Sequence, residues 1–360
     1  RRLDSTINPD LEITQYLSEV ASFKNSPTFV GGIAYHTAAK NRVILGMMED
    51  LITSNETGWR YAQDALHRFF EQVETRDKEE IVLPKIKEDF TTTLRYDEIP
   101  DETKGLMGSF FPERMKILGQ RSAELHKALA AHPEIKDFDN EDFSLHYQRS
   151  LFSSLQGLTR SAFDNLKRNI KNLPDEIKEE ANEILARRAE VLKCFKRVFA
   201  HKIDTLKIRT HGDYHLGQVL FTGNDFTIIN YDGEPARPFS ERRIRRSPLR
   251  DVAGMIRSFH YAAYSHILEQ EHNKRKEKDL EAWAEVWHHY ITRLFLQGYN
   301  ENIGSENLVP DNDADYNTLL DTYLLEKAVY ELNYELNNRK TWVLIPLRGI
   351  KRILERMNNA

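Results

Sequence analysis

The sequence THGDYHLGQVL at residues 210–220 decides the fold that we predict for this chain. Residues 206–209 alternate apolar and basic side chains, which predicts a short strand before Asp213. The glycine directly before Asp213 favours a turn, so its carboxylate is expected in an exposed position. Five residues later, Gln218 places an amide oxygen where the next apolar run begins. The pattern therefore predicts an acid and an amide side chain close together beside a strand.

A β-hairpin is predicted directly after this stretch. Apolar runs at 219–221 and 226–229 flank a polar TGND turn, and Asn230 ends the second strand, next to Gln218. A carboxylate can orient a hydroxyl group and accept its proton, and amide oxygens can ligate a hard cation such as Mg²⁺. An isolated HGD triplet is more often a simple turn. Asp-x4-Asn followed by a hairpin and a Mg-binding Asp, however, is the catalytic layout of kinase-like phosphotransferases, and the spacing is the same here.

The rest of the chain combines a small β-containing start with long helical segments. The sequence NPD at 8–10 is a typical helix start, and runs at 28–35 and 41–48 predict two strands around a polar turn. The predicted fold class is α+β, with a small mixed N-terminal part and a large helical part. Apolar residues recur at helical spacing at 57–75, 103–131, 141–172, 175–201, 248–269, 277–298, 314–338 and 342–357.

The composition is that of an ordinary globular protein. Of the 360 residues, 40% are hydrophobic and 30% are charged, which excludes a disordered chain. The net charge is −5, from 51 basic and 56 acidic residues, so nucleic-acid binding would need a local basic patch. The single cysteine, Cys194, excludes a disulfide framework and a cysteine-based zinc cluster. No apolar run approaches the roughly 20 residues that span a bilayer.

Two stretches around the predicted hairpin closely resemble bacterial maltokinases, which also occur as the C-terminal domain of trehalose synthase fusions. These stretches are residues 211–220 and NYDGEPARPFSERRIRRSPLRDVAGM at 230–255. The resemblance extends over nearly the whole chain. It includes RRL at 1–3, NPDLEI at 8–13, Trp59, Tyr61 and LEKAVYELNYELNNR at 325–339.

The resemblance implies a protein-kinase-like fold of the aminoglycoside phosphotransferase type. It implies a truncated, β-containing N-lobe at 1–50 and a helical C-lobe at 51–360, with the catalytic loop and a metal-binding hairpin at 206–235. It also implies a cytoplasmic enzyme that uses ATP and Mg²⁺ to convert maltose to maltose 1-phosphate, for α-glucan (glycogen) synthesis. A fused upstream trehalose synthase domain is the implied partner, with no role for nucleic acid or a membrane.

Individual residues match the motifs of the family. Asp213 matches the catalytic acid that orients the anomeric hydroxyl of the sugar and accepts its proton. Gln218 and Asn230 match the two Mg²⁺ ligands, and Asp251 matches an acid that braces the catalytic loop. The nucleotide positions are Glu12, as partner of a phosphate-binding lysine, and Met47, Met48, Glu49 and Leu51, in a hinge that contacts adenine. The sugar positions are His215, Lys327, Tyr330, Glu331, Tyr334 and Arg339, with ordinary core packing as the alternative for the tyrosines.

The chain departs from the family pattern in two places. Asn230 stands where the family has Asp, and an amide ligates Mg²⁺ without adding negative charge, so we expect weaker metal binding and an impaired enzyme. Asp232 lies two residues further on and could provide the carboxylate instead. The chain also begins at Arg1, just after the position of the family's phosphate-binding lysine, so as given it is expected to bind ATP poorly. The alternatives are a kinase for another sugar or an aminoglycoside, and a degenerate domain that binds sugar or supports a fused partner.

A dense run of arginines follows the predicted metal site. It spans residues 237–250 and is opposed only by Glu241. Pairing with carboxylates, phosphate handling and nucleic-acid binding are the three interpretations. The run contains a single aromatic residue, Phe239. This scarcity of aromatic residues and the negative total charge argue against nucleic acid, and the other two interpretations stay open. The run consists of Arg237, Arg242, Arg243, Arg245, Arg246 and Arg250.

Overall fold

The computed structural model describes residues 7–36, 42–76, 82–84, 86, 94–235, 237–268 and 274–359, so the RRL motif at 1–3 lies outside the described residues. Helix α1 (Pro9–Glu19) begins where the sequence predicts. The Asn8 side chain accepts a hydrogen bond from Leu11 N at 2.9 Å and caps the helix. Asp10 and Glu12 lie in the first turn, where carboxylates complement the partial positive charge of a helix start.

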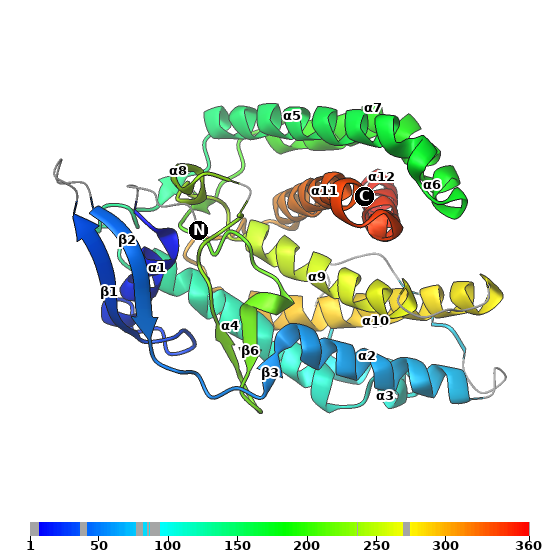
Figure 1. Ribbon diagram of the computed structural model, residues 1–360, viewed down its shortest axis with the longest axis horizontal. Helices are drawn as coiled ribbons and strands as arrows, with labels where there is room; N and C mark the ends of the chain where they lie inside the picture. The colour runs from blue at the N-terminus through cyan, green and yellow to red at the C-terminus, as the bar shows by residue number, and fades with distance from the viewer. Residues whose placement is uncertain are drawn as a thin grey trace.

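Strands β1 (Phe29–His36) and β2 (Arg42–Glu49) pair antiparallel and confirm the predicted N-terminal hairpin. Figure 1 shows this hairpin at one end of the molecule, beside α1 and away from most of the helices. It contributes little to the core, because many of its apolar side chains are exposed. These are Val30, Ile33, Tyr35, Leu45 and Met48.

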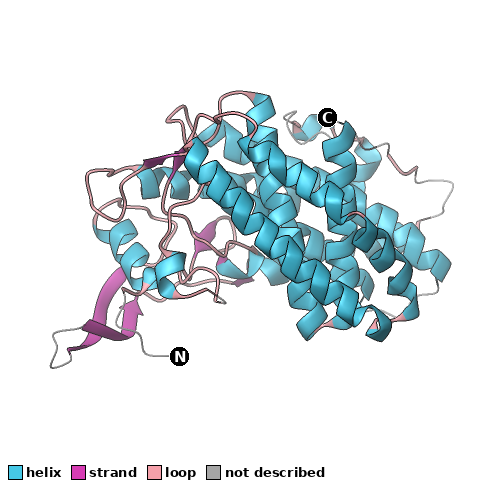
Figure 2. Cartoon of the chain, turned by 90° about the horizontal axis from the view of Figure 1, so that it is seen from above, coloured by secondary structure: helices cyan, strands magenta, loops and turns pink. Residues whose placement is uncertain are grey.

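Long helices form most of the described chain, as Figure 2 shows from above. None of the described helices is both long and apolar enough to cross a membrane. Six of the predicted segments correspond to one main helix each. These are α2 (Gly58–Thr75), α5 (Leu145–Asn169), α9 (Leu249–Leu268), α10 (Lys274–Asn302), α11 (Asp313–Asn338) and α12 (Leu344–Asn359).

Two predicted helical segments are divided in the structure. The segment predicted at 103–131 is two helices, α3 (Asp101–Met107) and α4 (Phe110–Ala130). Gly108 separates them with a φ of 68°, a left-handed conformation that ends a helix and that glycine adopts without strain. The segment predicted at 175–201 likewise divides into α6 (Asp175–Ala186) and α7 (Arg188–Lys196).

Two further small sheets lie among the helices. Strands β6 (Val219–Phe221) and β7 (Phe226–Ile228) form the predicted hairpin, and β3 (Glu56–Thr57) joins its edge, in the order β3-β6-β7. The strand predicted at 206–209 is only β5 (Leu206–Lys207), which pairs with β4 (Glu141–Asp142). Ile208 leaves β5 and pairs instead with Arg246, in an isolated bridge.

The helical part is held together by close helix contacts. Helices α4 and α10 approach each other through glycines, because a Cβ atom added at Gly119 would overlap the carbonyl oxygen of Phe295, and one at Gly298 would overlap that of Lys116. Helix α11 packs against α5, α9 and α12 and is buried along most of its length. The side chains that reach the candidate site from α9 and α11 therefore stand on rigid elements.

Acid is expected to destabilise the fold through His289, which is buried in α10. Burial lowers its pKa from 6.5 to about 3, helped by the charge of Arg293. The unfolded chain takes up a proton below pH 6.5 and the folded chain does not until about pH 3. The stabilisation is therefore complete above pH 6.5 and is lost as the pH falls towards 3, at up to about 1.4 kcal/mol per pH unit.

Urea unfolding at pH values of about 7.5, 5.5 and 4.5 measures this effect. The free energy of unfolding should fall with pH, and the fall should be shallower in His289→Gln. Equal pH dependence in the two proteins would contradict the assignment to His289.

Candidate functional site

The loop that carries Asp213 lies between β5 and β6 and is fixed by helix α9. Gly212 adopts a φ of 84° and allows a sharp turn just before Asp213. Asp251, in the first turn of α9, accepts hydrogen bonds from His211 N at 2.7 Å and from Gly212 N at 3.0 Å. This is the bracing contact that the sequence predicted for Asp251.

Asp251 is itself held in a buried network. Its side chain is 2% exposed, and its Oδ2 atom lies 3.2 Å from His126 Nε2. The other ring nitrogen of His126 is 2.9 Å from the Tyr299 hydroxyl. Burial alone raises the pKa of Asp251, but the hydrogen bond and charge of His126, with the Gly212 amide, bring its pKa below the ordinary value. Asp251 therefore stays ionised and keeps its hydrogen bonds to the loop.

The hairpin brings Gln218 and Asn230 together, as predicted. Asn230 Nδ2 donates a hydrogen bond to Gln218 Oε1 at 3.0 Å. Asn230 has a φ of 64°, in the left-handed region that asparagine tolerates better than most residues. Ile229 N donates to the Gln218 carbonyl oxygen at 3.0 Å, which fixes the two positions next to each other.

The donor chemistry of this turn fits a hard cation. Amide and carboxylate oxygens are present at Gln218, Asn230 and Asp232, and Mg²⁺ is usually held by one or two protein groups together with substrate phosphates and water. Among the residues that the structure describes, no group of three or more His, Cys, Asp or Glu side chains forms a complete metal cage. Gln218 and Asn230 are the residues that would hold Mg²⁺, with Asp232 as the nearby carboxylate.

A cleft of about 790 Å³ opens beside Asp213. This size is within the roughly 300–1,000 Å³ of small-molecule sites. Its walls come from the loop that carries Asp213, from the segment between β7 and α8 (Phe239–Arg242), from α2, α9 and α11, and from the residues that follow α11. All six residues predicted at the sugar line it: His215, Lys327, Tyr330, Glu331, Tyr334 and Arg339. Tyr334 is 48% exposed, which excludes core packing as its explanation.

Lys327 is the cation nearest to Asp213 among the side chains that line this cleft. Its Nζ atom lies 3.4 Å from Asp213 Oδ1 and 3.8 Å from Glu234 Oε2. Burial alone lowers the pKa of Lys327, but the charges of Asp213 and Glu234 outweigh this effect and raise its pKa. Tyr330 completes the group by donating its hydroxyl to Glu234 Oε1 at 2.6 Å. A permanent positive charge thus stands next to the predicted catalytic carboxylate.

His215 is neutral at ordinary pH. Burial lowers its pKa to about 4, although the neighbouring Asp213 charge acts in the opposite direction. Its Nδ1 atom accepts a hydrogen bond from Gly217 N at 3.1 Å, and its Nε2 atom lies 3.9 Å from Asp213 Oδ2. With Nδ1 engaged as an acceptor, Nε2 carries the proton and faces the side on which Asp213 lies.

Ion pairs and an aromatic ring fix the side chains that α11 and the residues after it contribute to the cleft. Arg257 donates to Glu331 Oε2 at 2.6 Å and 2.9 Å, and Arg339 donates to Glu335 at 2.7 Å and 3.0 Å. The Arg339 guanidinium also stacks 4.0 Å above the ring of Trp342. These contacts fix polar and aromatic groups at the same surface, an arrangement suited to polyhydroxylated ligands.

Sequence reasoning did not assign several residues of the cleft. The carboxylate of Glu335 lies four positions after that of Glu331, one helical turn further along α11, so the same face could have been read from the spacing. Ser258 and Tyr261 share a face of α9 in the same way. No sequence signal links the other residues to the cleft, because they come from distant segments. The unassigned residues are Trp59, Gly217, Glu234, Pro235, Gly254, Ser258, Tyr261, Glu335 and Trp342.

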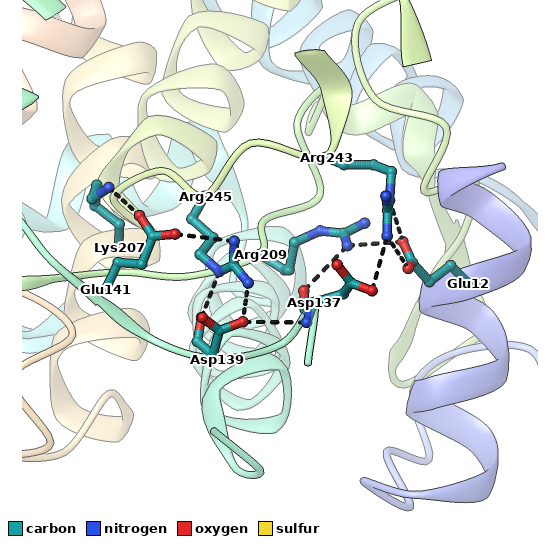
Figure 3. A network of polar contacts seen from close by, with 8 residues as sticks. All are labelled: Glu12, Asp137, Asp139, Glu141, Lys207, Arg209, Arg243 and Arg245. Carbon is teal, nitrogen blue, oxygen red and sulfur yellow. Dashed lines mark hydrogen bonds and ion pairs between the residues drawn. The ribbon is translucent and has the colours of Figure 1, made fainter. Parts of the chain in front are cut away.

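The predicted nucleotide residues are not brought to this cleft. Glu12 contacts two arginines: Arg209 Nη1 at 2.8 Å, and Arg243 Nε and Nη2 at 3.0 and 2.6 Å (Figure 3). The pairing of Glu12 with a phosphate-binding lysine stays a prediction, because the family pattern places that lysine before Arg1. The hinge residues lie at the end of β2 and just after it, where Leu51 is 94% exposed. The contact with adenine remains a prediction for Met47, Met48, Glu49 and Leu51, none of which lines the cleft.

The arginine run pairs mainly with carboxylates from other parts of the chain. Four of its six members do so, which favours the first of the three interpretations. Arg242 differs by donating to backbone carbonyl oxygens, and Arg246 donates to the Tyr147 hydroxyl. Figure 3 shows Arg243 with Glu12 and Asp137, and Arg245 with Asp139 and Glu141. Arg237 and Arg250 contact Glu326.

Comparison with known proteins gives a consistent class of relatives. No protein-family model matches the chain. The chain is 25% identical to a glucosamine kinase of Streptacidiphilus jiangxiensis over 140 residues, which are 39% of this chain and 30% of that protein. It is 43% identical to a glucosamine kinase of Mycolicibacterium smegmatis over 54 residues, 15% of this chain and 13% of the relative. The aligned part thus spans less than a third of either curated relative.

Solved structures match over nearly the whole chain. A glucosamine kinase in complex with glucosamine, ADP and inorganic phosphate has a TM-score of 0.67 at 18% identity, covering 96% of this chain and 68% of the other. A second crystal structure of a glucosamine kinase, crystal form A, has a TM-score of 0.70 at 19% identity, covering 99% and 73%. These structural matches confirm the predicted fold class, which is α+β and kinase-like. The relatives support a similarity to sugar kinases, and specificity for maltose stays a prediction.

Proposed function

We propose that this chain carries the acceptor-binding and catalytic part of an ATP- and Mg²⁺-dependent sugar kinase. The observation that carries the proposal is the position of Asp213. Its carboxylate lines a cleft with polar and aromatic walls, on a loop that leads directly to the Gln218–Asn230 pair. The similarity to glucosamine kinases, one of them solved with ADP, supports the same class of reaction.

Each group would have a distinct task. Asp213 would orient the acceptor hydroxyl and accept its proton, and Lys327 would offset negative charge beside it. His215, Glu331 and Arg339 would bind sugar hydroxyls. When bound, ATP would supply the phosphoryl group and Mg²⁺ would neutralise phosphate charge. Residues 1–50 would belong to the nucleotide-binding N-lobe.

For the acceptor we propose maltose, on the resemblance of residues 211–255 and 325–339 to maltokinases. The product would be maltose 1-phosphate for α-glucan synthesis in the cytoplasm, in a protein that includes a trehalose synthase domain. Glucosamine is the second candidate, because the curated relatives are glucosamine kinases. The acidic and basic side chains that line the cleft are four acids against Lys327, Arg339 and a neutral His215, which suits a neutral or a cationic sugar.

A substrate panel tests these proposals. The natural full-length protein is incubated with Mg·ATP and with maltose, glucosamine, glucose, trehalose or kanamycin, and ADP release and the sugar phosphate are measured. Maltose is expected to give the highest kcat/KM. A preference for glucosamine would support the second candidate, and no transfer to any acceptor would contradict the proposed kinase.

Replacement of Asn230 by Asp is expected to strengthen metal binding. The added charge should lower the Mg²⁺ concentration at half-maximal rate by about tenfold, since the amide contributes none. Kinase assays across a Mg²⁺ series measure this, and Mn²⁺ binding followed by electron paramagnetic resonance measures it without turnover. Asn224→Asp, in the exposed turn of the same hairpin, is the matched control. Equal Mg²⁺ dependence of Asn230→Asp and the native protein would contradict the expected impairment.

A degenerate, sugar-binding domain is the competing function. One observation favours it: the Asn230 amide group is hydrogen-bonded to the oxygen of Gln218, the atom that a metal would need. Calorimetric binding of maltose without turnover, in both the native protein and Asn230→Asp, would support this alternative over the kinase.

A further inference from the structure

The first turn of α1 makes contact with the turn that carries Asn230. Asp10 Oδ1 accepts a hydrogen bond from Tyr231 N at 2.7 Å, across 221 residues of sequence. The turn needs such an anchor, because Asn230 and Gly233 both have positive φ values, of 64° and 69°. A backbone amide next to Asn230 is therefore fixed by a side chain from the N-terminal part of the chain.

The segment after α1 also contacts this turn and the strand β7 before it. The buried Tyr231 hydroxyl donates to Ile228 O at 3.2 Å and lies at hydrogen-bond distance, 3.0 Å, from Ser26 Oγ. Asn25 closes two further hydrogen bonds to β7, with its side chain to Phe226 O at 2.8 Å and its carbonyl oxygen to Ile228 N at 2.8 Å. The end of the hairpin is thus hydrogen-bonded both to α1 and to the loop that follows α1.

Glu12, in the same first turn of α1, reaches the segment that leads to Asp213. Arg209 precedes Asp213 by four residues, is 1% exposed, and donates to Glu12 Oε2 at 2.8 Å. Arg243 donates to both oxygens of the same carboxylate, at 3.0 Å and 2.6 Å (Figure 3). Glu12 therefore joins α1 to both the segment before the catalytic loop and the arginine run.

We propose that the first turn of α1 positions the two halves of the transfer site, with Asp10 fixing the turn of Asn230 and Glu12 fixing the chain that leads to Asp213. This inference rests on the proposed function and gives Glu12 a role other than the predicted pairing with a lysine. Asp10 and Glu12 act here as positioning residues, since they contact the loops and not the cleft.

We expect changes in the first turn of α1 to affect nucleotide binding and sugar binding differently. The cleft is lined by residues of the catalytic loop, α2, α9 and α11, by residues that follow α11, and by Glu234 and Pro235 just after the Asn230 turn. Helix α1 contributes none of its described residues. Loss of the Asp10 contact should therefore weaken binding at the Gln218–Asn230 turn and change the KM for sugar much less. A general loss of folding would instead affect both.

The experiment compares four variants of the natural full-length protein. Asp10→Ala removes the acceptor of the Tyr231 amide, and Asp10→Asn keeps an oxygen in its place. Glu12→Gln removes the charge that faces both arginines, and Glu19→Gln, at the exposed end of the same helix, is the control. Isothermal titration calorimetry gives the dissociation constant of Mg·ADP, assays give kcat and the KM for sugar, and thermal melting confirms folding.

Asp10→Ala is expected to raise the dissociation constant of Mg·ADP by about five- to tenfold, as for the loss of one hydrogen bond. Glu12→Gln is expected to lower kcat by about five- to tenfold, because Glu12 fixes the chain that leads to Asp213. The KM for sugar should stay within about twofold, and Asp10→Asn and Glu19→Gln should resemble the native protein. Unchanged Mg·ADP binding in folded Asp10→Ala together with unchanged kcat in folded Glu12→Gln would overturn the inference, as would a parallel rise in the KM for sugar.

The calorimetric measurement also separates the two proposals. If the native protein binds Mg·ADP but phosphorylates no sugar, the proposed function fails, and weaker binding by Asp10→Ala still supports the positioning role. If the native protein is an active kinase and the variants match it, the positioning role fails and the proposed function stands. If Glu12→Gln does not fold, Arg243→Met is tested in its place. This change removes one of the two arginine contacts of Glu12 and leaves the buried Arg209 paired with Glu12.

Discussion

Replacement of Asp213 by Asn is expected to lower kcat by about three orders of magnitude, because an amide can orient the acceptor hydroxyl but cannot accept its proton. Two neighbouring groups of the cleft are engaged elsewhere. Glu234 accepts the Tyr330 hydroxyl at 2.6 Å. The Nε2 atom of His215, 3.9 Å from Asp213 Oδ2, carries the proton when Nδ1 accepts from Gly217 N. The loss should therefore appear in kcat, and the KM for sugar should change by less than about threefold.

Steady-state assays with the preferred sugar, together with Mg·ADP calorimetry, measure this prediction. Asp311→Asn, at an exposed position before α11, is the matched control and should keep native activity. The nucleotide dissociation constant of Asp213→Asn should also stay close to the native value. A kcat within about tenfold of the native enzyme would show that Asp213 is not the base.

The catalytic loop and its hairpin could be predicted because their signals are local. Asp213, Gln218 and Asn230 lie within eighteen residues, and the spacing between them is set by one short turn and two strands. The sugar positions on α11 could be placed on one helix face for the same reason. Element boundaries were less certain: the break at Gly108 depends on a single left-handed residue inside a long apolar pattern.

Contacts between distant segments could not be predicted from the sequence. Glu12 contacts Arg209 and Arg243 across 197 and 231 residues, and nothing in its local sequence indicates either partner. The arginine run presented the same difficulty, since its carboxylate partners come from α1, the 137–141 segment and α11. The fold alone decides which opposite charges are neighbours.

Replacement of Asp251 by Asn is the second change with a large expected effect. The Asp251 carboxylate accepts a backbone hydrogen bond on each oxygen, from His211 N on Oδ2 and from Gly212 N on Oδ1, and Oδ2 also contacts His126 Nε2. An amide offers one oxygen and one NH₂ group, so one of the two loop amides would face a donor instead of an acceptor. With the side chain 2% exposed, water cannot replace the lost contact. The free energy of unfolding should fall by about 3 kcal/mol.

Activity should fall with stability, because the two amides belong to the loop that holds Asp213. Urea unfolding and kcat are measured at a temperature where the variant remains folded, and Asp313→Asn, exposed in the first turn of α11, is the control with an expected change below about 0.5 kcal/mol. Since His126 Nε2 also loses its charged partner, the His126→Gln change in the Asp251→Asn background should cost less than in the native protein. Additive losses for the two changes would show that Asp251 and His126 act independently, and would contradict a single network that holds the catalytic loop.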